Sequence, residues 1–163
     1  MTDDILKLVV YSKGGNKESY GRLYEFYSND MYRFALSICK NRSDAEDAVQ
    51  EAALSVFKSI HCLYDPTKFK TYLFTALSNA CKKTFREKTD ELPENLAYEI
   101  EDFISADVKN ALDLLDTASR EIVLLSAVGG FKSGEIAKIL DMPSVTVRTK
   151  KRRALSKMRK ELE

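Results

Sequence analysis

Residues 134–163 read GEIAKILDMPSVTVRTKKRRALSKMRKELE, and this stretch decides the architecture of the chain. The pattern predicts a short helix, a three-residue turn and a second, basic helix, which together form a helix-turn-helix. Asp141 tolerates the left-handed backbone that a tight turn between helices often needs. Pro143 fixes φ at a helix start, where a backbone N–H is not required. The stretch therefore indicates DNA binding.

The second helix of this motif is amphipathic. Its apolar positions recur at helical spacing and predict a buried stripe of Val147, Ala154, Leu155, Met158 and Leu162. The opposite side carries Thr149, Arg152, Arg153 and Ser156, with Arg148 at its flank. Residues 141–163 hold eight Lys and Arg against three Asp and Glu, and this net charge of +5 suits phosphate. A basic, solvated surface helix is the alternative, and the preceding turn argues against it.

Composition excludes several other classes of protein. The 163 residues are 44% hydrophobic and carry a net charge of +1, which indicates a globular chain with room for a core. Three cysteines and one histidine lack the paired spacing of a zinc site, so we expect no metal and no cofactor. We see neither a signal segment nor a membrane-spanning run, and we expect reduced thiols in a cytoplasmic protein without membrane insertion.

The first part of the chain, residues 1–88, predicts an all-helical bundle. Apolar spacing indicates three long helices over about residues 17–40, 43–60 and 69–88. Gly14 and Gly15 separate the first of them from a short leading helix, and Pro66 marks a loop before the third. Ser43 and Glu46 fit a capping box at the start of the second. Antiparallel helices of this length pack into a compact bundle.

An acidic stretch follows the bundle. Residues 88–107 carry seven Asp and Glu against one Lys, contain Pro93 and lack sustained periodicity. We expect a flexible linker over residues 89–106, which separates two hydrophobic cores. A second helical domain over residues 107–163 then ends in the helix-turn-helix, after Gly129 and Gly130 have stopped the helix before it. The predicted fold class is all-α, with two small helical domains and no strand.

Short motifs along the chain occur in a recognisable order. They are YEFY at residues 24–27, MYRF at 31–34, DAEDAVQE at 44–51, FKTYL at 69–73 and EIA at 135–137. In these motifs the chain resembles the group IV, or extracytoplasmic-function, sigma factors, which direct bacterial RNA polymerase to promoters. The resemblance places region two in the first domain and region four in the second. Tyr72 stands where the family usually has tryptophan, and Asp116 replaces a usual proline but can cap the following helix.

The resemblance implies that the acidic side of the second long helix docks on the clamp helices of the largest polymerase subunit. Charged and amide side chains would orient such a contact between helices. The implied residues are Asp44, Glu46, Asp47, Gln50 and Glu51. Their spacing also places them on the solvent side, where ordinary solubility is an alternative explanation.

A second implied site binds the melted minus-ten element. The resemblance places a pocket for a flipped base of the non-template strand at the loop from His61 to Lys68, near the Asn79 amide. Bases can stack on aromatic rings while lysines follow the phosphates, although the rings of Phe69 and Tyr72 would also suit a hydrophobic core. The implied residues are His61, Cys62, Leu63, Tyr64, Asp65, Lys68, Lys70, Tyr72, Asn79, Lys82, Lys83 and Arg86.

The basic helix of the helix-turn-helix is implied to read the duplex minus-thirty-five element in the major groove. One bidentate contact from arginine to guanine contributes about 1–3 kcal/mol of discrimination between bases. The implied residues are Thr146, Arg148, Thr149, Lys150, Arg152 and Arg153.

The implied partners are core RNA polymerase, promoter DNA and an anti-sigma factor, which could tether the chain indirectly to a membrane. We expect no small-molecule substrate and no enzymatic activity, because the chain has no glycine-rich phosphate loop and no nucleophile paired with a base. The alternative function is a transcriptional regulator with a helical sensor domain. Such a regulator would bind its operator without polymerase.

Overall fold

The computed structural model describes the backbone of residues 2–87 and 104–163 and the side chains of residues 2–84 and 104–163. These residues form eight α-helices and two short 3-10 helices, and they contain no strand. The prediction of an all-α fold is therefore confirmed. The predicted linker, residues 89–106, lies outside the described residues except for its last three positions.

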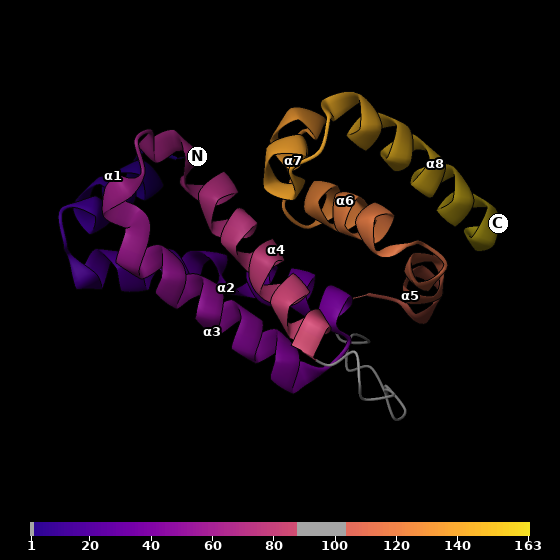
Figure 1. The fold of residues 1–163 in the computed structure, drawn as a ribbon, viewed down its shortest axis with the longest axis horizontal. Coiled ribbons are helices and arrows are strands. Elements are labelled where there is room, and N and C mark those ends of the chain that lie inside the picture. Colours follow the sequence, from indigo (N-terminus) through magenta and orange to yellow (C-terminus); the bar gives the residue numbers. More distant parts are fainter. Residues whose placement is uncertain (1, 88–103) are drawn as a thin grey trace.

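The first four helices pack together on one side of the molecule (Figure 1). They are α1 (Asp3–Lys13), α2 (Lys17–Cys39), α3 (Arg42–Ser59) and α4 (Phe69–Glu87), with the 3-10 helices η1 (Ile60–Cys62) and η2 (Pro66–Lys68) between α3 and α4. Helix α3 packs against both α2 and α4, and α1 packs against α2. Met31, Phe34 and Phe74 are fully buried among them. The three long helices predicted from apolar spacing are confirmed.

The start of α3 differs from the predicted capping box. Lys40 adopts a left-handed φ of 59° and ends α2, so that Asn41 is the first extended residue after it. The Asn41 side chain accepts a hydrogen bond from the backbone N–H of Asp44 at 3.0 Å and caps the helix. Ser43 and Glu46 lie inside α3, so the capping-box prediction is wrong. Asn caps a helix as well as Ser does, and here it stands at the turn.

The remaining helices are α5 (Ala106–Asp113), α6 (Thr117–Ala127), α7 (Ser133–Leu140) and α8 (Ser144–Leu162). Helices α7 and α8 form the predicted helix-turn-helix. Asp141 has a left-handed φ of 52°, and Pro143 directly precedes α8. Asp116 caps α6 by accepting a hydrogen bond from the backbone N–H of Ser119 at 2.7 Å. The turn and the cap predicted at these positions are confirmed.

Arg120 joins α5 to α6 from a buried position. Its guanidinium donates hydrogen bonds to the carbonyl oxygens of Leu112 and Leu115, each at 3.1 Å. Leu112 lies in the last turn of α5 and Leu115 just beyond its end, where carbonyl oxygens lack partners within the helix. One buried cation therefore satisfies the C-terminal end of a short helix.

The predicted apolar stripe of α8 is only partly correct. Val147, Ala154 and Met158 are buried against the preceding helices, whereas Leu155 and Leu162 are 44% and 47% exposed. At about 100° per residue, these two leucines lie roughly 60–80° around the helix from Val147. The contact with α5, α6 and α7 is too narrow to cover them.

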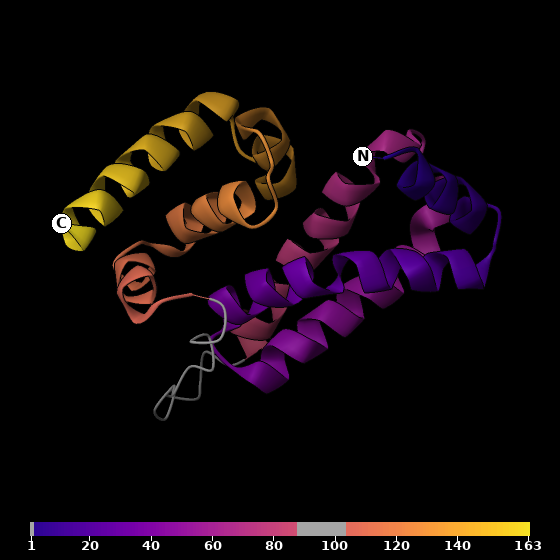
Figure 2. The same cartoon turned by 180° about the vertical axis from the view of Figure 1, so that it is seen from behind.

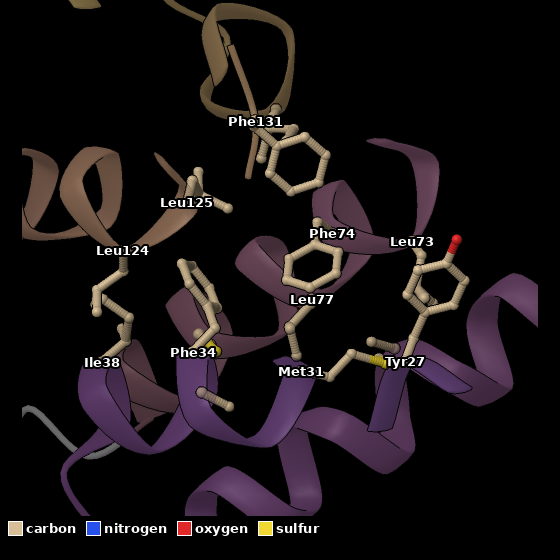
Figure 3. Close-up of a cluster of buried hydrophobic side chains, with 14 of the residues drawn as sticks. Tyr27, Met31, Phe34, Ile38, Leu73, Phe74, Leu77, Leu124, Leu125 and Phe131 are labelled. Carbon is tan, nitrogen blue, oxygen red and sulfur yellow. The ribbon is translucent and has the colours of Figure 1, made fainter. Parts of the chain in front are cut away.

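Buried residues of the two halves form one continuous hydrophobic core. Helix α7 packs against α4, and α6 packs against α2 (Figures 1 and 2). Phe131, between α6 and α7, packs edge-on against Phe74 with ring centroids 5.2 Å apart (Figure 3). The prediction of two separate cores is wrong, because each half leaves apolar side chains that the other half buries. We call this packing the closed arrangement.

Candidate nucleic-acid interface

Helix α8 presents a basic surface on the side away from the core. Arg148, Arg152 and Arg153 are exposed, and Thr146, Thr149 and Lys150 are half-buried beside them. Six residues predicted to contact duplex DNA therefore lie on the first three turns of one helix. The N-terminal part of such a recognition helix is the part that reaches base edges. Further along, Lys157 donates a hydrogen bond to the Leu114 carbonyl at 2.9 Å and holds α8 against the end of α5.

The acidic surface of α3 consists of Glu46, Asp47, Gln50 and Glu51, all exposed. Asp44 was predicted on the same solvent side, but its residue is only 8% exposed. Asp44 lies in the first turn of α3, where the helix dipole favours a carboxylate. The Asp44 prediction of a solvent-facing side chain is wrong, and four acidic or amide residues remain on this surface.

The loop between α3 and α4 consists mainly of the two 3-10 turns. Tyr64, at its tip, is 98% exposed, and His61, Cys62 and Lys68 are exposed as well. Leu63 instead faces the core and is 8% exposed. Asp65 is half-buried, and hydrogen bonds from the side chain and backbone of Thr67 hold the pKa of its carboxyl below the usual value. The loop therefore combines an unshielded aromatic ring with a charged carboxylate.

A groove of about 310 Å³ runs between α3 and α4. Tyr72 and Asn79 line it, and the Tyr72 hydroxyl lies 2.6 Å from the Ser59 hydroxyl. At one end Lys83 pairs with Glu51 at 3.0 Å across the groove. Residues predicted for minus-ten binding and one predicted for polymerase binding thus share a surface. The Arg86 side chain lies outside the described residues.

Two of the predicted minus-ten lysines, Lys70 and Lys82, interact with the second half of the molecule. The Lys70 ammonium donates a hydrogen bond to the Gly129 carbonyl and lies 4.9 Å from the centre of the Phe131 ring. Lys82 is half-buried, and its charge acts on Glu121 of α6. In the closed arrangement Lys70 is therefore held by a contact within the chain, and the charge of Lys82 is partly balanced by Glu121.

Sequence patterns do not predict the groups that lie near these lysines. A Cβ atom at Gly129 would lie 2.5 Å from the Phe131 ring and 2.8 Å from the Leu125 carbonyl, so glycine is required by packing there. Sequence patterns predict only a helix stop at the pair Gly129–Gly130. Glu121 is buried at 3% exposure, although it stands in a helix whose pattern suggested no buried charge.

The described part of the chain offers neither a metal-binding cluster nor a membrane-spanning helix. No group of three or more His, Cys, Asp or Glu side chains there could hold a metal ion. None of the helices found between residues 2 and 87 or 104 and 163 is long and apolar enough to cross a membrane.

Comparison with known proteins identifies the family. Residues 23–91 match Sigma-70 region 2, and residues 105–158 match Sigma-70, region 4. The chain is 32% identical over 143 residues to the RNA polymerase sigma factor SigV of Bacillus subtilis, covering 83% of this chain and 86% of SigV. It is 26% identical over 167 residues to the ECF RNA polymerase sigma factor SigX of the same organism, covering 90% and 85%. The chain belongs to the extracytoplasmic-function sigma factors.

Solved structures share the fold of this sigma factor. CnrH in complex with the cytosolic domain of CnrY is 24% identical, with a TM-score of 0.79 over 98% of this chain and 97% of that one. The sigma factor RpoE in complex with the anti-sigma factor NepR, from Bartonella quintana, is 21% identical, with a TM-score of 0.75 over 89% and 97%.

The family assignment decides between the two functions that the sequence left open. The chain is an alternative sigma factor that directs promoter-specific initiation of transcription. A regulator with a helical sensor domain is not favoured, because the first half matches region two of sigma factors.

Proposed function

We propose that this sigma factor reads the minus-thirty-five element as duplex DNA through the first turns of α8. The exposure of Arg148, Arg152 and Arg153, opposite the buried Val147 and Ala154, is the observation that supports this assignment most directly. A helix that packs on one side and carries arginines on the other can enter the major groove without losing its core contacts. Thr146, Thr149 and Lys150 flank these arginines.

The melted minus-ten element binds at the loop of residues 61–68 and along the groove between α3 and α4. Tyr64 offers a ring on which an unstacked base can pack, and stacking of this kind contributes about 1–3 kcal/mol per base. Asn79 is exposed on the groove, where its amide can both donate to and accept from a base edge. The buried Leu63 supports the loop from below, and Lys68 and Lys83 are placed to follow the phosphates.

Core RNA polymerase binds the acidic surface of α3. Glu46, Asp47, Gln50 and Glu51 lie on neighbouring turns of one exposed face, which suits a helix-to-helix contact oriented by charge. Catalysis stays with the polymerase, and this chain contributes no catalytic group. We place its activity in the cytoplasm, with region two over residues 1–88, an acidic linker over 89–106 and region four over 107–163.

An anti-sigma factor is a further partner in this proposal. RpoE, which shares the fold, was solved with the anti-sigma factor NepR. The closed arrangement of this chain would suit such a partner, because it already brings both halves together.

Run-off transcription with purified core polymerase and a library of promoter fragments tests the proposal. The wild-type chain should start transcripts at a defined set of sites, and Asp47→Lys should abolish both transcription and co-purification with core enzyme. Glu18→Lys, at another exposed acidic position on α2, serves as the matched control and should retain both. Equal core binding by the two variants would refute the assignment of the α3 surface.

A further inference from the structure

Glu121 lies in the interface between the two halves of the molecule. Leu124 and Leu125, one turn further along α6, face Ile38 and Phe34 of α2 (Figure 3). Residues three or four apart share a helix face, so Glu121 points toward the first half as well. Its residue is 3% exposed. The groups around its carboxyl belong to α4 and are Ser78, Cys81 and Lys82.

The buried carboxyl has little compensation for the loss of water. Glu121 Oε1 and Ser78 Oγ make no hydrogen bond with any described residue. Arg120, the adjacent cation on α6, points away toward α5. Burial raises the pKa of Glu121 above its usual value, and the charge of Lys82 and the nearby Ser78 hydroxyl oppose this shift without cancelling it. A protonated carboxyl therefore fits the closed arrangement better than a carboxylate does.

We propose that Glu121 couples the packing of the two halves to proton binding. With Glu121 protonated, α6 and α7 remain packed against α2 and α4; ionisation of Glu121 favours separation of the halves. The reason is that separation returns the carboxylate to water, whereas the closed arrangement keeps it among Ser78, Cys81 and apolar side chains. This coupling concerns conformation, so it can be tested without any promoter or polymerase.

The direction of the pH dependence follows from linkage. In the separated state Glu121 is solvated and titrates near the usual value of 4.5, and in the closed arrangement it titrates higher. Between these two values the closed arrangement binds one proton more. Closure is therefore favoured at the acidic end of this window and weakens as the pH rises through it. The closing equilibrium constant falls by up to about tenfold per pH unit there.

Other ionisable groups also lie at or near the interface. The Cys39 thiol and burial together raise the pKa of Cys81, so that Cys81 stays neutral across the window. Lys40 of α2 pairs with Asp113 of α5 at 3.3 Å. Glu121→Gln leaves this ion pair unchanged, so the comparison of that variant with the wild type isolates the contribution of Glu121.

Closure limits the lysines of the proposed minus-ten surface. This step, unlike the preceding ones, rests on the proposed function. In the closed arrangement Lys70 donates a hydrogen bond to the Gly129 carbonyl, and Lys82 lies near enough to Glu121 for its charge to act on that carboxyl. Separation of the halves releases Lys70 from this hydrogen bond and leaves the charge of Lys82 available for phosphate. Ionised Glu121 therefore favours the state in which the minus-ten surface is complete.

Small-angle X-ray scattering of the full chain between pH 4.5 and 8 tests the coupling. The radius of gyration of the wild type should increase as the pH rises, and Glu121→Gln should stay compact at every pH because its amide cannot ionise. Glu161→Gln, an exposed position on α8, should behave like the wild type. An identical pH response in Glu121→Gln and wild type, or no response in the wild type, would overturn the proposal.

A second measurement keeps the test decisive if Glu121→Gln is poorly folded. The carboxyl carbon of Glu121 is titrated by NMR in the wild type and in Phe131→Ser, which removes the ring contact with Phe74 and opens the interface. The coupling requires a raised pKa in the wild type and a value near 4.5 in the variant. A raised pKa in both proteins would place the cause within region four and reject the coupling. Unchanged binding of Phe131→Ser to duplex DNA verifies that its helix-turn-helix is intact.

Discussion

Two exposed arginines of α8 should contribute to DNA binding in different ways. Arg152 and Arg159 are both exposed and lie on the same side of the helix, but they are separated by seven residues, or about 10 Å. Only the N-terminal part of a recognition helix reaches base edges, so the two arginines should make different types of contact with DNA. Arg152 should carry sequence information, and Arg159 should contribute charge.

Arg152→Ala should weaken binding to a minus-thirty-five duplex by about 5- to 150-fold, because one bidentate base contact is lost. Arg159→Ala should weaken binding to cognate and random duplexes equally. Fluorescence anisotropy with both duplexes at a fixed salt concentration measures the ratio. A specificity ratio that Arg152→Ala leaves unchanged would show that this arginine contacts phosphate only.

Asp116→Ala should lower the free energy of unfolding by about 0.5–2 kcal/mol, since it removes the cap of α6. Hydrogen bonds from the backbone and side chain of Ser119 hold the pKa of Asp116 below its usual value. The charged cap therefore stabilises the fold above the usual carboxyl pKa, and this contribution is lost as the pH falls through the lowered pKa. Asp116→Asn should keep most of the cap and lose that pH dependence. Urea unfolding at pH 7 and pH 4 compares the three proteins.

At the scale of elements, α5 is too short to be stable alone. It has eight residues, and isolated helices of that length are marginal in water. Its C-terminal carbonyls depend on Arg120, and its surface depends on contact with α8. The helix-turn-helix in turn rests on α6, so that one buried arginine supports the position of the DNA-binding helix.

Arg120→Ala should lower the free energy of unfolding by about 1.5–3 kcal/mol, because buried carbonyl oxygens lose a charged donor. Arg120→Lys should recover only part of this loss, since an ammonium cannot bridge the two carbonyls as the planar guanidinium does. Arg148→Ala, an exposed arginine, is the control for loss of charge. Thermal unfolding followed by circular dichroism would contradict this role if Arg120→Ala and Arg148→Ala melted together.

At the scale of the whole molecule, closure depends on apolar contact more than on charge. Phe131 packs against Phe74, and the side chains of the Lys40–Asp113 pair remain 25% and 35% exposed. Partly exposed ion pairs contribute about 0–1 kcal/mol and are screened by salt. Salt does not screen the aromatic contact between Phe131 and Phe74, because neither ring is charged.

At the acidic end of the Glu121 window, raising the salt concentration from 0.1 to 0.5 M should therefore leave the radius of gyration near the value of about 15 Å expected for a compact chain of this length. Phe131→Ser should expand the molecule at both salt concentrations. Val10→Ser, which removes an exposed apolar side chain from α1, should not. Expansion of the wild type at high salt would show that ion pairs hold the halves together.

Local chemistry made much of the fold predictable from the sequence. Asp141 and Pro143 specify the turn of the helix-turn-helix, and Asp116 specifies a helix start, because each acts on its own backbone within a few residues. The capping-box prediction was wrong although it also concerned neighbouring residues, because Asn41 rather than Ser43 caps α3. Exposure of the α8 arginines could also be predicted from helical periodicity. Periodicity assigns residues to one face of a helix, and this does not depend on what packs against that face.

The sequence by itself determined the helices, their turns and the basic face of α8, because backbone angles and periodicity depend on neighbours along the chain. Only the tertiary structure decided that Leu63 and Asp44 turn inward, that Lys70 is held by Gly129, and that Glu121 is buried. Those outcomes depend on which distant surfaces meet, and an amphipathic pattern shows that a face is covered without showing what covers it. The joining of two predicted cores into one has the same physical cause.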